Sequence, residues 1–378
     1  MIDLHGNIVK QFTLNEIVNE YKGQEYSTDY HKLLNDKEQD RDAARRNWKK
    51  IENIKDLKEG YLSQVVHIIG KMMVEYKAIV VLESLNTGFI NSRGKFEKQV
   101  YQKFENALIT KLCYLADKNK GNSDDGSILK AYQFAGHPDK YQCGFIFYIP
   151  AWNTSKIDPV TGFCNYINTK YESVEKSREL FSKFDDIRFN KEKNYYEFVI
   201  KDYSLFNKKA EDTHKEWTLC TYGTRIETFR NPDKNNEWDN REVNLTDCFD
   251  TLFKSAKISR TDNIKSAIIA QNEKEFFKEL LKLLALLLQL RNSITGSEED
   301  YILSPVADEN GVFYDSRKYQ NDDAVLPKDA DANGAYNIAR KGLWAVRQLQ
   351  QTEDLKKCNL AINNAEWLRF VQQKPYLK

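Results

Sequence analysis

Acidic residues at two distant points of the sequence are the candidates for chemistry. Glu83 closes a short apolar run, Ala78 to Leu82, which is rich in β-branched residues and typical of a strand buried on both faces of an α/β sheet. Ligands of open α/β sheets bind just beyond the carboxyl ends of the strands. Glu83 therefore stands where a catalytic or metal-binding acid is expected, although a solvated carboxylate at a strand end is the commoner meaning of such a pattern.

The second acid begins a helix near the end of the chain. Counting from Asp331, the residues at +4, +7 and +8 are Ala335, Ile338 and Ala339, which share one helical face. We therefore expect Asp331 on the face that packs inward. It could simply cap the helix, but Asp329 could do so equally well. Two acids at one helix start favour Mg²⁺, which binds a few carboxylate oxygens and keeps water and phosphate in its other positions.

The order of these motifs resembles a known enzyme family. A Glu that closes a buried strand, followed much later by an Asp-x-Asp-x-Asn-x-Ala-x-Asn-Ile helix, is similar to the RuvC nuclease pattern of the RNase H-like fold. The similarity covers nearly the whole chain, from Gly6 to Trp367. Four segments in particular resemble the type V-A CRISPR effector nucleases, namely Leu82 to Asn86, Glu97 to Glu105, Gln289 to Ser293 and Asp329 to Tyr336.

The resemblance implies an α/β protein with an RNase H-like (RuvC) mixed sheet flanked by helices and with an inserted α/β Nuc domain. RuvC-like parts are expected at 1–34, at 55–154 with the central strand and the Glu motif, and at 301–378 with the Asp motif. A segment like the bridge helix of the family is expected at 35–54, and the Nuc domain at 155–300.

Hydrophobic periodicity predicts the elements around these motifs. Residues 1–14 read as strand, turn and strand. Amphipathic helices are expected at 61–76 and 97–115, and a buried helix at 274–290 would deliver Arg291 at its end. Strands are expected at 144–150, 196–200 and 217–222.

The resemblance also assigns roles to single residues. Glu83 and Asp331 would hold two Mg²⁺ ions for phosphodiester hydrolysis. The family has a functionally important Arg in the motif that contains Arg291; an Arg fork can hold a scissile phosphate, whereas a cation at a helix end explains the position without chemistry. The first catalytic Asp of the family is expected upstream of residue 1, and Asp3, at a turn, does not replace it.

A basic stripe is the first candidate for nucleic-acid binding. Arg41, Arg45 and Lys49 follow one another at a spacing of four, with Arg46 beside them. A solvated helix face is the commoner explanation, and contact with phosphates is the alternative. The family has an aromatic anchor on its bridge helix that Trp48 would match, with its pocket in a recognition lobe that this chain lacks.

A basic loop close to Glu83 is the second candidate. Arg93 and Lys95 lie in the loop at 91–95, where they could hold the backbone of a substrate. Loops of this composition are equally often ordinary surface loops.

Composition bounds the remaining possibilities. The 378 residues suffice for two domains, and 41% hydrophobic with 30% charged residues describes a globular chain. A net charge of +1 provides no global basic field. The six cysteines form no C-x-x-C pair, which indicates free thiols in a reducing cytoplasm, and the sequence contains neither a signal peptide nor an apolar run long enough for a membrane span.

A zinc site is not expected. Related transposon-encoded RNA-guided nucleases have a zinc knuckle after a similar Thr-Ser, but Asp158 and Thr161 occupy the places of its cysteines here. The five histidines are unclustered. The implied cofactor is therefore Mg²⁺ alone.

Three functional hypotheses remain open. The first is the nuclease lobe of a bacterial, cytoplasmic type V-A effector, with guide RNA, target DNA and a missing N-terminal recognition lobe as partners and no membrane. The second is a catalytically incompetent module for nucleic-acid binding or assembly. The third is a stand-alone RNase H-like nuclease with a rearranged metal site.

Overall fold

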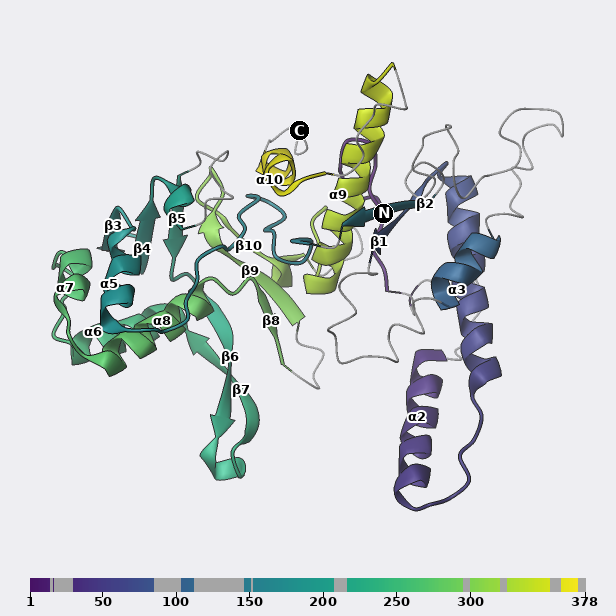
Figure 1. Cartoon of the computed structure of the whole chain (residues 1–378), viewed down its shortest axis with the longest axis horizontal. Coiled ribbons are helices and arrows are strands. Elements are labelled where there is room, and N and C mark those ends of the chain that lie inside the picture. The colour runs from purple at the N-terminus through teal and green to yellow at the C-terminus, as the bar shows by residue number, and fades with distance from the viewer. Residues whose placement is uncertain are drawn as a thin grey trace. The chain divides into compact units, whose positions relative to one another are not determined.

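A computed structural model describes residues 1–13, 16, 30–84, 103–111, 146–150, 152–206, 216–294, 300–319, 325–353 and 362–372 (Figure 1). The chain forms two compact units. Unit 1 comprises Met1–Val9, Asn153–Asn337 and Ile362–Lys378, and unit 2 comprises Lys10–Trp152 and Ile338–Ala361. In the described ranges no helix is long and apolar enough to cross a bilayer.

The centre of unit 1 is a six-stranded sheet in the order β10-β9-β5-β4-β3, with β8 pairing β9. Its strands are β3 (Asp186–Asn190), β4 (Tyr195–Ile200), β5 (Trp217–Cys220), β8 (Arg291–Ser293), β9 (Asp300–Ala307) and β10 (Phe313–Asp315). All of the pairings are antiparallel. The strands predicted at 196–200 and 217–222 are confirmed as β4 and β5.

A separate hairpin extends away from this sheet (Figure 1). Its strands are β6 (Thr224–Asn231) and β7 (Glu237–Asn244), paired without a break from end to end. The turn between them includes a single 3-10 turn, η4 (Pro232–Lys234), and two Asn residues with positive φ, Asn235 and Asn236. Asn tolerates that conformation, so this turn fixes the register of the hairpin.

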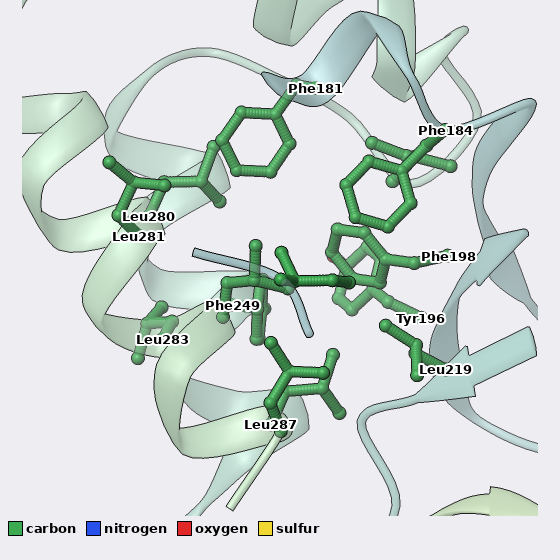
Figure 2. Packing of buried hydrophobic residues seen from close by; sticks show 14 of the residues in the cluster. Phe181, Phe184, Tyr196, Phe198, Leu219, Phe249, Leu280, Leu281, Leu283 and Leu287 are labelled. Carbon is green, nitrogen blue, oxygen red and sulfur yellow. The ribbon is translucent and has the colours of Figure 1, made fainter. Parts of the chain in front are cut away.

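Helices pack against one another and against the sheet of unit 1 to form its core. They are α5 (Val174–Ser182), α6 (Leu245–Ser255), α7 (Ile264–Ala270) and α8 (Lys274–Leu287). Unit 1 also contains α10 (Asn364–Gln372) and the short 3-10 turns η2 (Tyr203–Leu205) and η5 (Ser316–Lys318). The Phe198 ring of β4 packs against the rings of Phe184 and Phe249, and the ring centroids are 5.5 Å apart in both pairs (Figure 2). Burying one side chain of this size contributes about 1.5–3 kcal/mol, and α8 alone buries eight. The predicted buried helix at 274–290 is thus confirmed.

Unit 2 contains two long helices and a parallel strand pair. These are α2 (Tyr30–Arg46), α3 (Lys55–Glu75), β1 (Val80–Ser84) and β2 (Ile146–Pro150), and residues 103–111 are also helical. The helix predicted at 61–76 corresponds to the larger part of α3, which ends at Glu75, and 103–111 form part of the one predicted at 97–115. The buried core is small, with Val66, Met73, Leu108 and Ile146 at its centre.

Strand β1 differs from its prediction in one respect. It was expected to be buried on both faces, but residues 78–83 are only half-buried. In the part of the chain that the structure describes, β1 pairs with β2 alone, and a strand with one neighbour keeps part of its surface exposed.

The start of the chain is a tight turn in unit 1. Ile2 and Ile8 form an antiparallel bridge, and Gly6 takes a φ of 89° between them. The Asp3 carboxylate accepts hydrogen bonds from the backbone N–H groups of His5 (2.8 Å) and Asn7 (2.9 Å). Asp3 is therefore a turn residue, as its sequence context predicts.

Helix α9 (Ala330–Gln351) begins in unit 1 and continues into unit 2. Its orientation corrects the prediction made from spacing, because Asp331 and Ala335 are exposed whereas Asn333, Tyr336, Asn337 and Lys341 are buried. The buried face carries polar side chains whose N–H groups reach backbone carbonyls. A search for apolar periodicity does not detect such a face.

Candidate active site

Arg291 joins two carboxylates in unit 1. Its Nη1 lies 3.1 Å from Asp331 Oδ1, and its Nη2 lies 2.9 Å from Asp300 Oδ2. The Arg291 side chain is 49% exposed and that of Asp331 is 83% exposed, whereas that of Asp300 is 22% exposed. The planar fork of a guanidinium suits two acceptors of this kind and can equally accept a phosphate.

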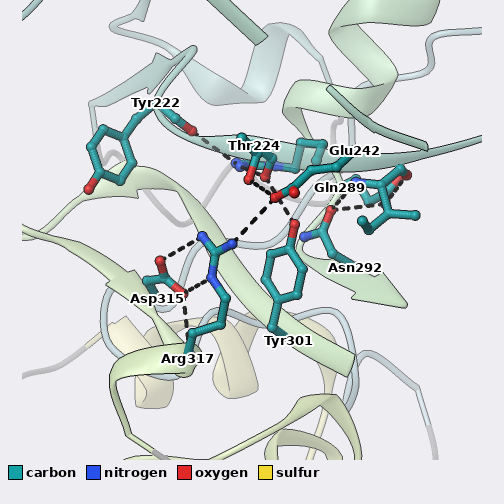
Figure 3. Close-up of polar contacts among 10 residues, drawn as sticks. Tyr222, Thr224, Glu242, Gln289, Asn292, Tyr301, Asp315 and Arg317 are labelled. Atoms are coloured by element: carbon teal, nitrogen blue, oxygen red, sulfur yellow. Dashed lines mark hydrogen bonds and ion pairs between the residues drawn. The ribbon is translucent and has the colours of Figure 1, made fainter. Parts of the chain in front are cut away.

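The neighbours of Arg291 in the sequence explain how it is held. Asn292 is fully buried, and its Oδ1 accepts hydrogen bonds from the Ile226 N–H (3.0 Å) and from Gln289 Nε2 (3.2 Å). Gln289 Nε2 also donates to the Ile226 carbonyl at 3.0 Å (Figure 3). Gln289 and Asn292 thus fix β8 against β6, and the alternation of a strand turns Arg291 to the opposite side from Asn292.

Arg291 was expected at the end of the preceding helix, and this expectation is wrong. Helix α8 ends at Leu287, and Arg291 is the first residue of β8, where it pairs with Ile302 of β9. The short linker from Leu288 to Leu290 allows the chain to change from helix to strand. Complementation of a helix dipole therefore does not explain this cation.

A second polar layer supports β9 beside this site (Figure 3). The Tyr301 hydroxyl donates to the Thr224 carbonyl at 3.3 Å. Arg317 forms a two-pronged ion pair with Asp315 (2.9 and 2.8 Å), lies 3.6 Å from Glu242 and stacks over the Tyr301 ring. These contacts link β9 and β10 to the base of the β6–β7 hairpin.

Asp300 is the residue that sequence reasoning missed. It is the first residue of β9, and the pairing of Ser293 with Asp300 brings it back beside β8. Burial raises its pKa, the negative charges of Asp331 and Asp329 act in the same direction, and Arg291 opposes them. The pairing of β8 with β9 places this acid near Arg291, and the glycine at position 296 of the sequence is the one local signal of a hairpin there.

Two acids at the start of α9 have separate tasks. The Asp329 carboxylate accepts a hydrogen bond from the Ala332 N–H at 2.7 Å, so it caps the helix. Asp331 lies in the first turn and is exposed, with Arg291 as its ion-pair partner. Its predicted inward orientation is wrong, because the inward positions belong to Asn333 and Asn337, whose amides donate to the carbonyls of Ile157 and Thr154, each at 3.0 Å.

Glu83 lies in unit 2, one residue before the end of β1, opposite Ile149 of β2. Lys341 of α9 is its electrostatic neighbour. Glu83 belongs to unit 2 and Asp331 to unit 1, so the metal site that they are expected to share stays a prediction.

Comparison with known families decides the class. The family model of the RuvC nuclease domain matches residues 1–376. This chain belongs to the RuvC nuclease family. Its α/β fold is the RNase H-like class that the motifs predicted, and its class of activity is phosphodiester hydrolysis by a nuclease.

The basic stripe of this RuvC nuclease is shorter than predicted. Helix α2 ends at Arg46, so Lys49 does not continue the stripe of Arg41 and Arg45. Arg41 Nε lies 3.4 Å from Glu38, and Arg45 Nη1 lies 2.6 Å from Asp42. Acids on the same helix thus compensate part of the stripe.

The structure describes only some of the other residues that are predicted to contact nucleic acid or a recognition lobe. Trp48 is 96% exposed and takes a φ of 54°, just after the end of α2. Arg46 and Lys49 beside it are exposed. Arg93 and Lys95 lie outside the described residues, and their predicted role is unchanged.

The donor atoms of unit 1 include two carboxylates that suit a divalent ion. Asp331 presents an exposed carboxylate, and Asp300 Oδ1 is buried with no hydrogen-bond partner among the described residues. Both are oxygen donors of the kind that Mg²⁺ prefers. Within the described ranges, however, no group of three or more His, Cys, Asp or Glu side chains converges closely enough to hold a metal. The pair in unit 1 therefore fits part of a magnesium site.

The turn at the place of the zinc knuckle is closed by hydrogen bonds. The buried Asp158 Oδ1 accepts from the Thr161 N–H (2.6 Å), the Thr161 hydroxyl (2.9 Å) and the Val160 N–H (3.0 Å). Asp158 and Thr161 therefore hydrogen-bond to each other, and these bonds stabilise the turn.

Proposed function

We propose that this RuvC nuclease is the nuclease lobe of a type V-A CRISPR effector, which cleaves DNA selected by a guide RNA. The observation that carries the proposal is the Arg291 fork between Asp300 and Asp331. It is built on the segment Gln289 to Ser293, one of the four that resemble this effector class. The buried hydrogen bonds of Gln289 and Asn292 give these two residues of the segment a structural role without any part in the chemistry.

Asp331 and Glu83 would hold Mg²⁺ in this proposal, with Asp300 near Asp331. Bound Mg²⁺ supplies an activated water and stabilises the leaving oxygen of the phosphodiester. The protein has to place its carboxylates and keep them deprotonated. Arg291 favours the charged form of Asp300, whose pKa is otherwise raised by burial.

Arg291 has a second task toward the substrate. Its pairs with Asp331 and Asp300 are partly solvent-exposed, and ion pairs of this kind contribute only about 0–1 kcal/mol. A phosphate oxygen can therefore replace a carboxylate on the fork at little cost. Arg291 would hold the scissile phosphate while Asp300 keeps the other side of the guanidinium in place.

Contacts remote from the chemistry would come from unit 2. The exposed Trp48 presents a large apolar ring to a partner, in keeping with the expected recognition lobe. Arg41, Arg45, Arg46, Lys49, Arg93 and Lys95 are the proposed contacts to nucleic-acid phosphates.

The test is a cleavage assay on the full 378-residue chain with Mg²⁺, using single-stranded and duplex DNA with and without guide RNA. Glu83→Ala and Asp331→Ala should each lower the rate by at least about 100-fold, because each removes a carboxylate from the metal site. Glu275→Ala is the matched control, since Glu275 is also an exposed acid in the first turn of a helix.

The outcomes separate the hypotheses. Cleavage that survives both substitutions would overturn this site. Cleavage that needs neither guide nor recognition lobe favours a stand-alone nuclease. Specific DNA binding without cleavage, even when the recognition lobe is supplied as a separate chain, favours a binding module.

A further inference from the structure

A buried ammonium group lies in unit 2, at the part of α9 that faces the strand pair. Lys341 is 0% exposed, although lysines are almost never fully buried unless they are paired. Its Nζ donates to the Pro150 carbonyl at 2.8 Å and to the Trp152 carbonyl at 2.6 Å, and it lies 3.9 Å from the centre of the Trp152 ring. The proposed mechanism gives this group no task.

The carbonyls that hold Lys341 place it beside Glu83. Pro150 is the last residue of β2 and pairs with Ser84, while its predecessor Ile149 pairs with Glu83. The Glu83 charge favours the ammonium form and opposes burial, which lowers the Lys341 pKa to about 7. A cation and an anion thus lie within electrostatic reach of each other at the carboxyl end of the strand pair.

Close packing of α9 on β1 fixes this arrangement. A Cβ atom added to Gly342 would lie 2.3 Å from Val81 Cγ2, so the helix backbone touches the Val81 side chain directly. Val81 precedes Glu83 by two residues on β1 and points to the same side of the strand. Lys341 therefore adjoins the residue at which α9 directly touches the strand of Glu83.

We propose that Lys341 is a positioning residue for Glu83: its ammonium ties the end of β2 to α9 and orients the Glu83 carboxylate toward the metal that Glu83 is expected to bind. The metal part of this inference rests on the proposed function. The Lys341–Glu83 coupling does not, and it can be measured without metal or substrate.

A double-mutant cycle on the full chain in EDTA tests the coupling. Urea unfolding would be compared for the native protein, Glu83→Gln, Lys341→Met and the double variant at one pH. Lys341→Met should raise the unfolding equilibrium constant on the order of 100-fold with Glu83 present, because two carbonyls and a carboxylate lose their partner. In the Glu83→Gln background, Lys341→Met should raise the unfolding equilibrium constant only on the order of tenfold.

Lys282→Met is the matched control. Lys282 pairs with the buried Glu227 at 2.5 Å in unit 1, so its penalty should be equal in both backgrounds. If Lys341→Met does not fold, Lys341→Gln takes its place, since its amide can still donate to both carbonyls without a charge. Equal penalties for the Lys341 substitution in the two backgrounds would overturn the proposal.

A nuclease assay then separates positioning from plain stability. In a variant that is folded at the assay temperature, loss of positioning should lower kcat by roughly 10–100-fold and leave KM for DNA unchanged. Coupling in EDTA together with a native chain that stays inactive even when the recognition lobe is supplied would refute the proposed activity and keep the Lys341–Glu83 coupling. An active native chain in which the two Lys341 penalties are equal would refute the Lys341–Glu83 coupling and keep the proposed nuclease activity.

Discussion

The two acids expected to share a metal are held in opposite ways. Glu83 sits on a half-buried strand of unit 2, with the buried Lys341 as its cation. Asp331 sits on the exposed first turn of α9 in unit 1, with the half-exposed Arg291 as its cation. One acid is placed by backbone and buried charge, and the other by a long side chain that solvent reaches.

The two cations therefore differ in how easily each can leave its carboxylate. A buried ammonium bound to two carbonyls cannot leave its carboxylate without exposing several unpaired groups. An exposed guanidinium can exchange one acceptor for another at small cost. We therefore expect substitutions near Glu83 to affect stability first, and substitutions near Asp331 to affect catalysis first.

The largest expected effect concerns the exposed side of this comparison. Arg291→Ala should lower kcat by roughly 100- to 1000-fold, because a preorganised donor to the phosphate is lost, while the urea midpoint of unfolding changes little. Arg291→Lys should recover only part of the rate, since a lysine keeps the charge but not the fork. A variant with native kcat, or one that loses activity only by unfolding, would contradict the assignment.

A smaller effect on stability is expected along α9. Gly342→Ala should destabilise the protein by about 1–3 kcal/mol, because the added methyl group has no room beside Val81. Gly334 on the same helix has no atom within 4 Å of its added Cβ, so Gly334→Ala should stabilise by about 0.4–1 kcal/mol. Chemical denaturation of both variants measures the difference. Equal effects would show that α9 is not pressed against β1.

The smallest effect concerns Asp158, a buried carboxylate that forms no ion pair with the residues that the structure describes. Burial raises the pKa of Asp158, so the native state holds its proton more tightly than the unfolded chain does. The native protein should therefore lose stability relative to Asp158→Asn as the pH rises above about 4, because only the native carboxylate has to ionise in a buried site. At neutral pH the two should agree within about 1 kcal/mol, since the Asn oxygen can keep the bonds from Val160 and Thr161.

Asp158→Ala controls for loss of the turn itself. It leaves the Thr161 and Val160 donors without their acceptor, so it should destabilise at every pH. Urea unfolding between pH 4 and pH 8 gives all three curves. A constant difference between the native protein and Asp158→Asn would contradict the buried ionisation.

The sequence predicted the elements better than their orientation. Strands β4 and β5 and helix α8 follow from apolar runs, because burial of such runs is decided locally. The inward face of α9 was missed because Asn333, Asn337 and Lys341 are buried through bonds to carbonyls far away in the sequence.

The site was predictable in part for the same reason. Motif resemblance selected Arg291 and Asp331, and the structure brings these two together. Asp300 lies in no such motif, and its proximity depends on the register of β8 and β9. Arg291 was misplaced at a helix end because three residues suffice to change the chain from α8 to β8, which is within the ordinary uncertainty of element boundaries.

The sheet of unit 1 also dictates an order of assembly during synthesis. The β6–β7 hairpin pairs residues that are close in the chain, so it can form within about 1–10 μs of leaving the ribosome. Strand β5 pairs with β9 through Leu219 and Val306, and the chain between them must be made first. At ~5–20 residues per second this takes several seconds. The hairpin, which ends at Asn244, is therefore made before Asp300 and Asp331, and the nascent nuclease has neither of these two acids beside Arg291 until β9 and the start of α9 emerge.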